Sequence, residues 1–322
     1  MLVTRRFLTL GIVALGLVFA PVSADASGKP YRIVATTGML ADLIQTVGGD
    51  VVEVKALMGP GVDPHAYRQT RSDIVAMANA DLVIWHGLYL EAQLEEFLEE
   101  LATRQSVVAL ADQVAAEKLV SHDEYEGRFD PHLWMDPRLW NDVLDAAVTA
   151  LTEKFPRDAE LFASNAEAYR AELMKLADYA DIVIGSVPQS ARALISAHDA
   201  FNYFGEAYGF QVIGIQGIST ESEAGLRRIE ELVDRLVEDD IRAVFVESSV
   251  ADRNIRALIE GAAARGHEVS IGGELFSDAM GQPGTYEGTY LGMIDHNATT
   301  ITRALGGEAP AQGRLGKLGV EG

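Results

Sequence analysis

The chain has 322 residues, of which 48% are hydrophobic and 23% charged, so its length and composition allow two ordinary domains with packed cores. Its formal net charge of -22 argues against a nucleic-acid partner, because the phosphates would be repelled. The absence of cysteine excludes disulfides, thiolate metal sites, cysteine nucleophiles and lipid attachment through a cysteine.

Residues 1–26 predict a cleavable export signal. Two arginines precede an apolar run, and the small residues that follow suit cleavage after Ala24 or Ala26. The arginines fit either the general secretory route, which is the simpler interpretation, or the twin-arginine route. The apolar run is too short for a comfortable membrane span. We therefore expect an exported, soluble protein of the periplasm that is not a lipoprotein.

Residues 27–154 alternate short apolar runs with amphipathic stretches, which is the pattern of an α/β lobe. We expect strands at "YRIVATT", "VVEVKALM", "DLVIWHG" and "SVVAL". We expect helices at "GMLADLIQTVGG" and "EAQLEEFLEELA", and a loop at "GPGVDPHAYRQTRSD". Strands separated by helices in this way indicate a parallel sheet.

Residues 155–187 predict one long linking helix. No glycine or proline lies between Pro156 and Gly185, and proline suits the first turn of a helix. At 1.5 Å per residue such a helix is roughly 40 Å long, which is longer than one small domain needs. We therefore expect it to connect two lobes.

Residues 188–308 return to the α/β pattern, and residues 309–322 predict a flexible, glycine-rich tail. Strands are expected at "ARALISAH", "FQVIGIQG", "RAVFVESS" and "HEVSIGG". Helices are expected at "EAGLRRIEELVDRLVED", "DRNIRALIEGAAARG" and about 288–305. The predicted fold class is α/β, with two lobes of parallel sheets flanked by helices and joined by one long backbone helix.

Four side chains close to the ends of predicted strands are candidate metal ligands, namely His65, His132, His198 and Asp278. Open α/β sheets bind ligands outside the carboxyl ends of their strands, and each lobe supplies two candidates, so a joint site would lie between the lobes. Three imidazoles and one carboxylate suit Zn²⁺ or Mn²⁺ better than Ca²⁺ or Mg²⁺. Spacing alone does not distinguish these residues from surface or turn residues, because no two share the i, i+4 spacing of a zinc-binding helix.

Several motifs, in order along the chain, resemble the TroA-like family of periplasmic zinc- and manganese-binding proteins of ABC importers, also called cluster A-I solute-binding proteins. The motifs are "GPGVDPHAYRQTRSD", "FDPHLWMDP", "SAHDAFNYFGEAYGF", "GISTESEAG", "VFVESS" and "IGGELFSDAMG" followed by "GTYEGTYLGMIDHN". The resemblance extends from about Tyr31 to Leu305 and includes the long helix. It implies that His65, His132, His198 and Asp278 coordinate the ion.

The resemblance further implies a monomer that captures Mn²⁺ or Zn²⁺ and delivers it to a cognate ABC permease in the inner membrane. The zinc-uptake branch often carries a histidine-rich loop before the second ligand, and here that place holds only His122 among several acids. This departure favours manganese, or binding of both metals. Many Gram-positive relatives are lipoproteins, whereas this chain lacks the cysteine that would carry the lipid.

Other residues have interpretations that compete with metal binding. Asp63 and Asp130 each precede a proline and are expected to shape the loop or to hydrogen-bond the neighbouring histidine. Glu247 is expected to support a ligand, and His86 is a reserve ligand. His267 and His296 are expected to be structural.

Two other function classes stay open at this stage. A zinc-dependent hydrolase would keep a water on the metal and use Glu247 as its base. A siderophore or haem carrier would need a cleft lined by aromatic residues or arginine. We expect a binding protein and not an enzyme, because the sequence contains no HExxH motif, nucleophile elbow or phosphate loop.

Overall fold

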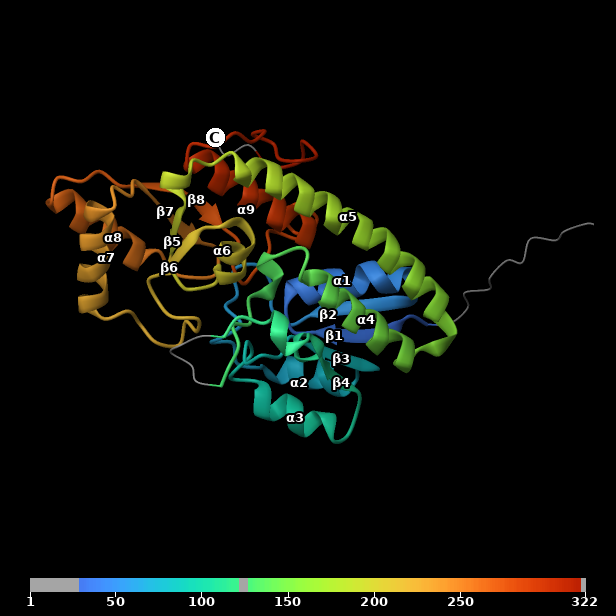
Figure 1. Ribbon diagram of the computed structural model, residues 1–322. Helices are drawn as coiled ribbons and strands as arrows, with labels where there is room; N and C mark the ends of the chain where they lie inside the picture. Colours follow the sequence, from blue (N-terminus) through green and yellow to red (C-terminus); the bar gives the residue numbers. More distant parts are fainter. Residues whose placement is uncertain (1–28, 122–126, 320–322) are drawn as a thin grey trace, which may run out of the picture.

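The computed structural model of the chain describes residues 29–121 and 127–319. Two α/β lobes lie next to each other, and one long helix runs along both of them (Figure 1). The predicted export signal, residues 1–26, and His122 lie outside the described residues. Within these ranges no helix combines the length and the hydropathy needed to cross a bilayer.

The first lobe is built on a four-stranded parallel sheet in the order β2-β1-β3-β4. Its strands are β1 (Tyr31–Ala35), β2 (Val52–Ala56), β3 (Leu82–Trp85) and β4 (Val107–Ala109). Its helices are α1 (Gly38–Gly48), α2 (Arg71–Ala78), α3 (Glu95–Ala102) and α4 (Trp140–Lys154). Every residue of β3 is buried, as expected for an inner strand of a sheet covered on both faces. The four strands predicted for this lobe are confirmed.

The second lobe contains two parallel pairs of strands, β5–β6 and β7–β8, and β5 lies beside β7. The strands are β5 (Ala193–Ser196), β6 (Gln211–Gly214), β7 (Ala243–Glu247) and β8 (Ser270–Leu275). The helices are α6 (Asn202–Tyr208), α7 (Leu226–Glu238), α8 (Arg253–Ala264) and α9 (Tyr290–Ala304). The predicted fold class, two lobes with parallel sheets flanked by helices, is confirmed.

The long helix α5 spans Ala159–Gly185 and follows a short 3-10 turn at Pro156–Asp158. It packs against α1 and α4 of the first lobe and against α9 of the second (Figure 1). Its buried residues, including Leu173, Leu176 and Ala180, belong to one hydrophobic cluster that continues from the first lobe into α9. A shared core of this kind resists wide separation of the lobes.

The chain after α9 returns to the surface of that helix. The backbone N–H of Arg314 donates to both carboxylate oxygens of Asp295, at 3.0 Å each. Leu318 is buried. The described part of the predicted tail, up to residue 319, therefore contacts the second lobe through these residues.

Three helices were not predicted from the sequence, namely α2, α4 and α6. Helix α2 begins inside the segment interpreted as a loop, because Thr70 and Asp73 form a reciprocal capping box at its first turn. Helix α4 buries a face that includes Trp140, Val143 and Leu144. This helical spacing is visible in the sequence.

Candidate metal centre

The four candidate ligands all lie beyond the carboxyl ends of strands. His198 follows β5 by two residues, and Asp278 follows β8 by three. His65 lies in the loop after β2, and His132 directly precedes a 3-10 turn at Leu133–Met135 in the segment after β4. These ends meet between the lobes, so the topology places the four side chains together, as open α/β sheets do at their ligand sites.

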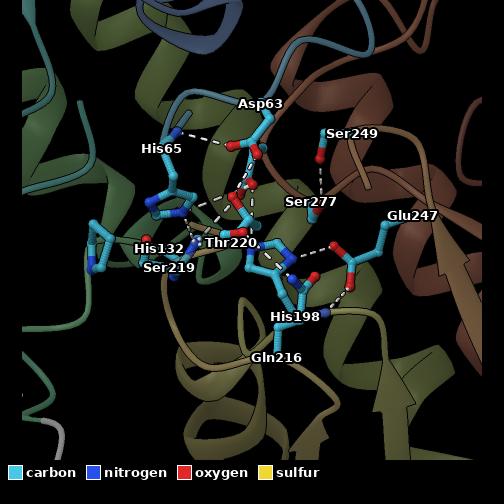
Figure 2. A network of polar contacts seen from close by, with 12 residues as sticks. Asp63, His65, His132, His198, Gln216, Ser219, Thr220, Glu247, Ser249 and Ser277 are labelled. Atoms are coloured by element: carbon cyan, nitrogen blue, oxygen red, sulfur yellow. Dashed lines mark hydrogen bonds and ion pairs between the residues drawn. The ribbon is translucent and has the colours of Figure 1, made fainter. Parts of the chain in front are cut away.

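Three imidazole nitrogens converge on one point (Figure 2). The Nε2 of His132 lies 3.3 Å from the Nε2 of His65 and 3.3 Å from the Nε2 of His198. For a tetrahedral ion with nitrogen ligands at about 2.0–2.1 Å, neighbouring ligand atoms are separated by roughly 3.3–3.4 Å. The observed spacings therefore match a small divalent cation held by nitrogen.

The carboxylate of Asp278 is the fourth potential ligand and lies next to the three imidazole nitrogens. Its Oδ1 lies 3.4 Å from Nε2 of His132, and its Oδ2 lies 3.2 Å from Nε2 of His198 and 3.9 Å from Nε2 of His65. One ligand atom from each of the four buried residues lies within 4.8 Å of all the others. Neither oxygen of Asp278 has a hydrogen-bond donor among the described residues, which is unusual for a buried carboxylate and suits a cation as its partner.

Two of the imidazoles are oriented by a carboxylate at the nitrogen that points away from the site. The Nδ1 of His132 lies 2.7 Å from Oδ1 of Asp130. The Nδ1 of His198 lies 2.5 Å from Oε2 of Glu247, and Oε1 of Glu247 accepts the backbone N–H of His198. Such contacts fix the tautomer that presents Nε2 to a metal and make that nitrogen a better donor.

The electrostatics separate His65 from the other two histidines. At His198 burial is outweighed by the carboxylates of Asp278 and Glu247, which raise the pKa well above its usual value. Burial lowers the pKa of His65 to about 3, so this imidazole is neutral. Burial also disfavours the charged form of His132, but the carboxylates of Asp130 and Asp278 outweigh it and raise the pKa to about 9. The facing imidazoles of His198 and His132 likewise outweigh burial at Asp278 and hold its pKa well below the usual range.

His65 is positioned through its backbone and across the lobe interface. Its N–H donates to Oδ1 of Asp63 at 2.9 Å. The hydroxyl of Thr220, which belongs to the second lobe, donates to Oδ2 of the same aspartate at 2.5 Å. The sequence singled out Asp63 but gave no separate role to Thr220, because a contact between residues so distant in the chain leaves no local pattern.

The remaining predicted residues lie outside this group. His86 is buried, and its Nε2 lies 2.7 Å from the carbonyl oxygen of Pro131, which connects it to the loop of His132 rather than to the centre. His267 and His296 contact the backbone carbonyl oxygens of Ile241 and Glu274. The structure therefore gives each of these histidines a structural contact.

The environment of the centre does not favour the other two function classes. A hydrolase would need Glu247 as a base, yet both of its oxygens are engaged by His198. A haem or siderophore carrier would need a broad cleft, whereas the relative exposure of the four candidate ligands is 2% or less.

Known proteins similar to this chain agree with a metal-binding site. The family described as "Zinc-uptake complex component A periplasmic" matches residues 33–304. The manganese-binding lipoprotein MntA of Bacillus subtilis is 43% identical over 299 residues, which cover 93% of this chain and 96% of the relative. The zinc-binding protein TroA of Treponema pallidum is 42% identical over 300 residues, or 91% of this chain and 96% of the relative.

The fold is shared as well. The solved structure of the periplasmic zinc-binding protein TroA from Treponema pallidum superposes with a TM-score of 0.84 at 43% identity, covering 86% of this chain and 99% of the other.

Proposed function

The chain belongs to the family of the periplasmic zinc-uptake component A, and we propose that it captures a divalent metal ion between its lobes and delivers it to an ABC importer. The observation that supports this most directly is the convergence of three Nε2 atoms and one carboxylate at the spacing that a small cation requires.

We propose His65, His132, His198 and Asp278 as the ligands of the transported ion. All four are buried, and the oxygens of Asp278 face the imidazole nitrogens. A nearly complete protein shell explains how the ion can be held without help from bulk water. The ion is Mn²⁺ or Zn²⁺, the metals named for the two relatives described above.

The direct test is metal stoichiometry and affinity of the purified protein by isothermal titration calorimetry. We expect one tightly bound ion, and loss of most of the affinity in Asp278→Ala. His296→Ala is the matched control, because its imidazole contacts a carbonyl oxygen of β8. Unchanged stoichiometry and affinity in Asp278→Ala would overturn the ligand assignment.

In-vitro affinity does not decide which metal is transported, because Zn²⁺ binds more tightly than Mn²⁺ at almost any such site. Uptake of each metal in cells that lack the gene, with and without complementation, decides it. Restored uptake of one metal alone identifies that metal as the cargo.

We further propose a monomer that is free in the periplasm and has no catalytic role. The whole sequence contains no cysteine to which a lipid could be attached, although several relatives are lipoproteins. Metal-dependent hydrolase turnover that disappears in Glu247→Gln would contradict the proposed absence of a catalytic role.

The lobe boundaries proposed are 27–154 and 188–308, with 155–187 as the linking helix.

The ion's release is proposed to involve a small tilt and loop movements instead of wide hinge closure. The hydrophobic cluster along α5 spans both lobes, so wide opening would expose much apolar surface. Small-angle scattering with and without metal tests this, and a large change in the radius of gyration would contradict it.

A further inference from the structure

The segment 215–222, here called the bridging segment, follows β6 and contains part of the motif "GISTESEAG". It is bound to the loop of His198 through the backbone. The N–H groups of Ile215 and Gln216 donate to the carbonyl oxygens of Ser196 and Ala197, at 3.1 and 3.0 Å. The bridging segment therefore belongs structurally to the strand end that carries His198.

The turn of the bridging segment is also fixed internally. The side-chain amide of Gln216 donates to the carbonyl oxygen of Ser222 at 3.0 Å, and Gln216 is 8% exposed. This buried amide closes the turn that presents residues 218–221 to the first lobe. Figure 2 shows Gln216 below the imidazoles, with Ser219 and Thr220 beside them.

From this turn the segment contacts the first lobe close to His65. The hydroxyl of Thr220 donates to Oδ2 of Asp63, and Oδ1 of Asp63 accepts the N–H of His65. Ile218 and Ser219 line a small pocket together with His65. The side chains of Gln93 and Glu221 form a second hydrogen bond between the bridging segment and the first lobe, at an exposed position.

The loop that carries His65 is also confined on its other side. Gly61 has a φ of +70°, and a Cβ at this position would lie 3.3 Å from the carbonyl oxygen of Ser248, just beyond β7. The loop therefore lies between the end of β7 and the bridging segment. The ends of β6 and β7 in the second lobe therefore confine the loop that carries His65 in the first lobe.

We propose that Thr220 is a positioning residue for retention of the metal ion. Its hydroxyl joins the bridging segment, and with it the loop of His198, to the Asp63 carboxylate that holds the backbone of His65. Release of the ion requires His65 to separate from His198, and this separation breaks the Thr220–Asp63 hydrogen bond. The proposal rests on the proposed function, because it assumes that His65 and His198 share the ion.

The experiment measures metal association and dissociation rates of the full mature chain by stopped-flow with an excess of a Zn²⁺ chelator. In Thr220→Val, which removes the hydroxyl at nearly constant volume, we expect dissociation to be faster by roughly tenfold, as for loss of a hydrogen bond to a charged group. The association rate should change much less. Thr220→Ser keeps the hydroxyl and should restore slow dissociation.

Thr149→Val is the matched control, because the Thr149 hydroxyl bonds a carbonyl oxygen within α4, away from the centre. Thermal unfolding of the metal-free protein distinguishes a positioning role of Thr220 from a general role in stability. A general role would lower the melting temperature of Thr220→Val without a specific change in the rate of metal dissociation. Equal dissociation rates in wild type, Thr220→Val and Thr220→Ser would overturn the proposal. A wild-type chain that binds no metal would instead overturn the proposed function.

Discussion

The two Asp-Pro-His loops of the first lobe have the same sequence but different surroundings. Asp130 is fully buried, and its Oδ1 contacts both the backbone N–H and the Nδ1 of His132. Asp63 is half-buried, and its Oδ1 accepts the backbone N–H of His65. Asp130 therefore fixes the imidazole ring of His132 and the proton on its Nδ1, whereas Asp63 fixes only the backbone of the loop that carries His65.

Both aspartates also accept a hydrogen bond from the second lobe, again with different partners. The amide of Asn202 on α6 donates to Oδ2 of Asp130 at 3.0 Å, and Tyr203 donates to the carbonyl oxygen of the same residue. Asp63 receives the hydroxyl of Thr220. The comparison teaches that a repeated tripeptide can supply one ligand whose ring is fixed by the aspartate and one whose backbone alone is fixed by it.

The largest effect is expected when His132, the ligand whose ring contacts Asp130, is removed. His132→Ala should lower metal affinity by more than about 100-fold, beyond the 10–100-fold that is typical for loss of a residue supporting a ligand. His65→Ala should cost less, because the three remaining ligands include both imidazoles that are oriented by carboxylates. Competition titration with a chromophoric chelator measures both. A larger loss in His65→Ala would reverse the comparison.

The next largest effect is expected when the two aspartates are replaced, and the loss of metal affinity should differ between the two loops. Asp130→Asn should lower affinity by about 10–100-fold, because the carboxylate that fixes the ring of His132 is lost. Asp63→Asn keeps an oxygen for the backbone N–H of His65 and should cost less. The same titration applies, with circular dichroism as a check on folding. Equal losses in the two variants would show that the loops are equivalent.

The dependence on pH should come from the two histidines whose rings contact carboxylates, because the pKa of His132 and that of His198 are both raised. The pKa of His132 is raised to about 9, so below that pH the metal must displace its proton, and affinity should rise with pH by up to about tenfold per unit for this proton. The pKa of His65 is lowered to about 3, so this residue releases no proton near neutrality.

Calorimetry in buffers of different ionisation enthalpy counts the protons released on metal binding. Asp130→Asn should reduce that number, because the pKa of His132 falls without the carboxylate. Asp63→Asn should leave it unchanged. Proton release that stays the same in Asp130→Asn would contradict the assignment of the displaced proton to His132.

The smallest effect concerns the glycines that lead into the loops. Gly61 and Gly127 have φ values of +70° and +78°, so alanine at either should destabilise the fold by roughly 1–2 kcal/mol. A Cβ at Gly127 meets no atom within 4 Å, whereas a Cβ at Gly61 crowds the carbonyl oxygen of Ser248. Urea unfolding should therefore show a larger loss of stability in Gly61→Ala. A larger loss in Gly127→Ala would contradict this confinement of the first loop.

Much of the fold could be predicted from local patterns. The eight predicted strands are observed, because each is a short apolar run between polar turns. The long helix begins and ends near Pro156 and Gly185, where the sequence places a helix-starting proline and a terminating glycine. Helix α6 was missed because its seven residues are too few to show a clear period.

The four candidate ligands could be proposed from their places after strands, but their convergence depends on how two distant lobes pack. The roles of Asn202 and Thr220 were missed for the same physical reason. Thr220 and Asp63 are 157 positions apart, and a hydroxyl–carboxylate contact has no sequence periodicity. Glu247 was expected to support a ligand, and its contacts with His198 agree with that expectation.

The packed helix α5 also has a practical consequence for anyone who wishes to follow metal binding optically. Because one hydrophobic cluster joins α5 to both lobes, dyes placed on opposite lobes should change their separation very little. A single dye near the bridging segment should respond more strongly. The chain has no cysteine, so one introduced thiol, for instance Ser222→Cys at an exposed position, would be labelled selectively and could turn the protein into a metal sensor.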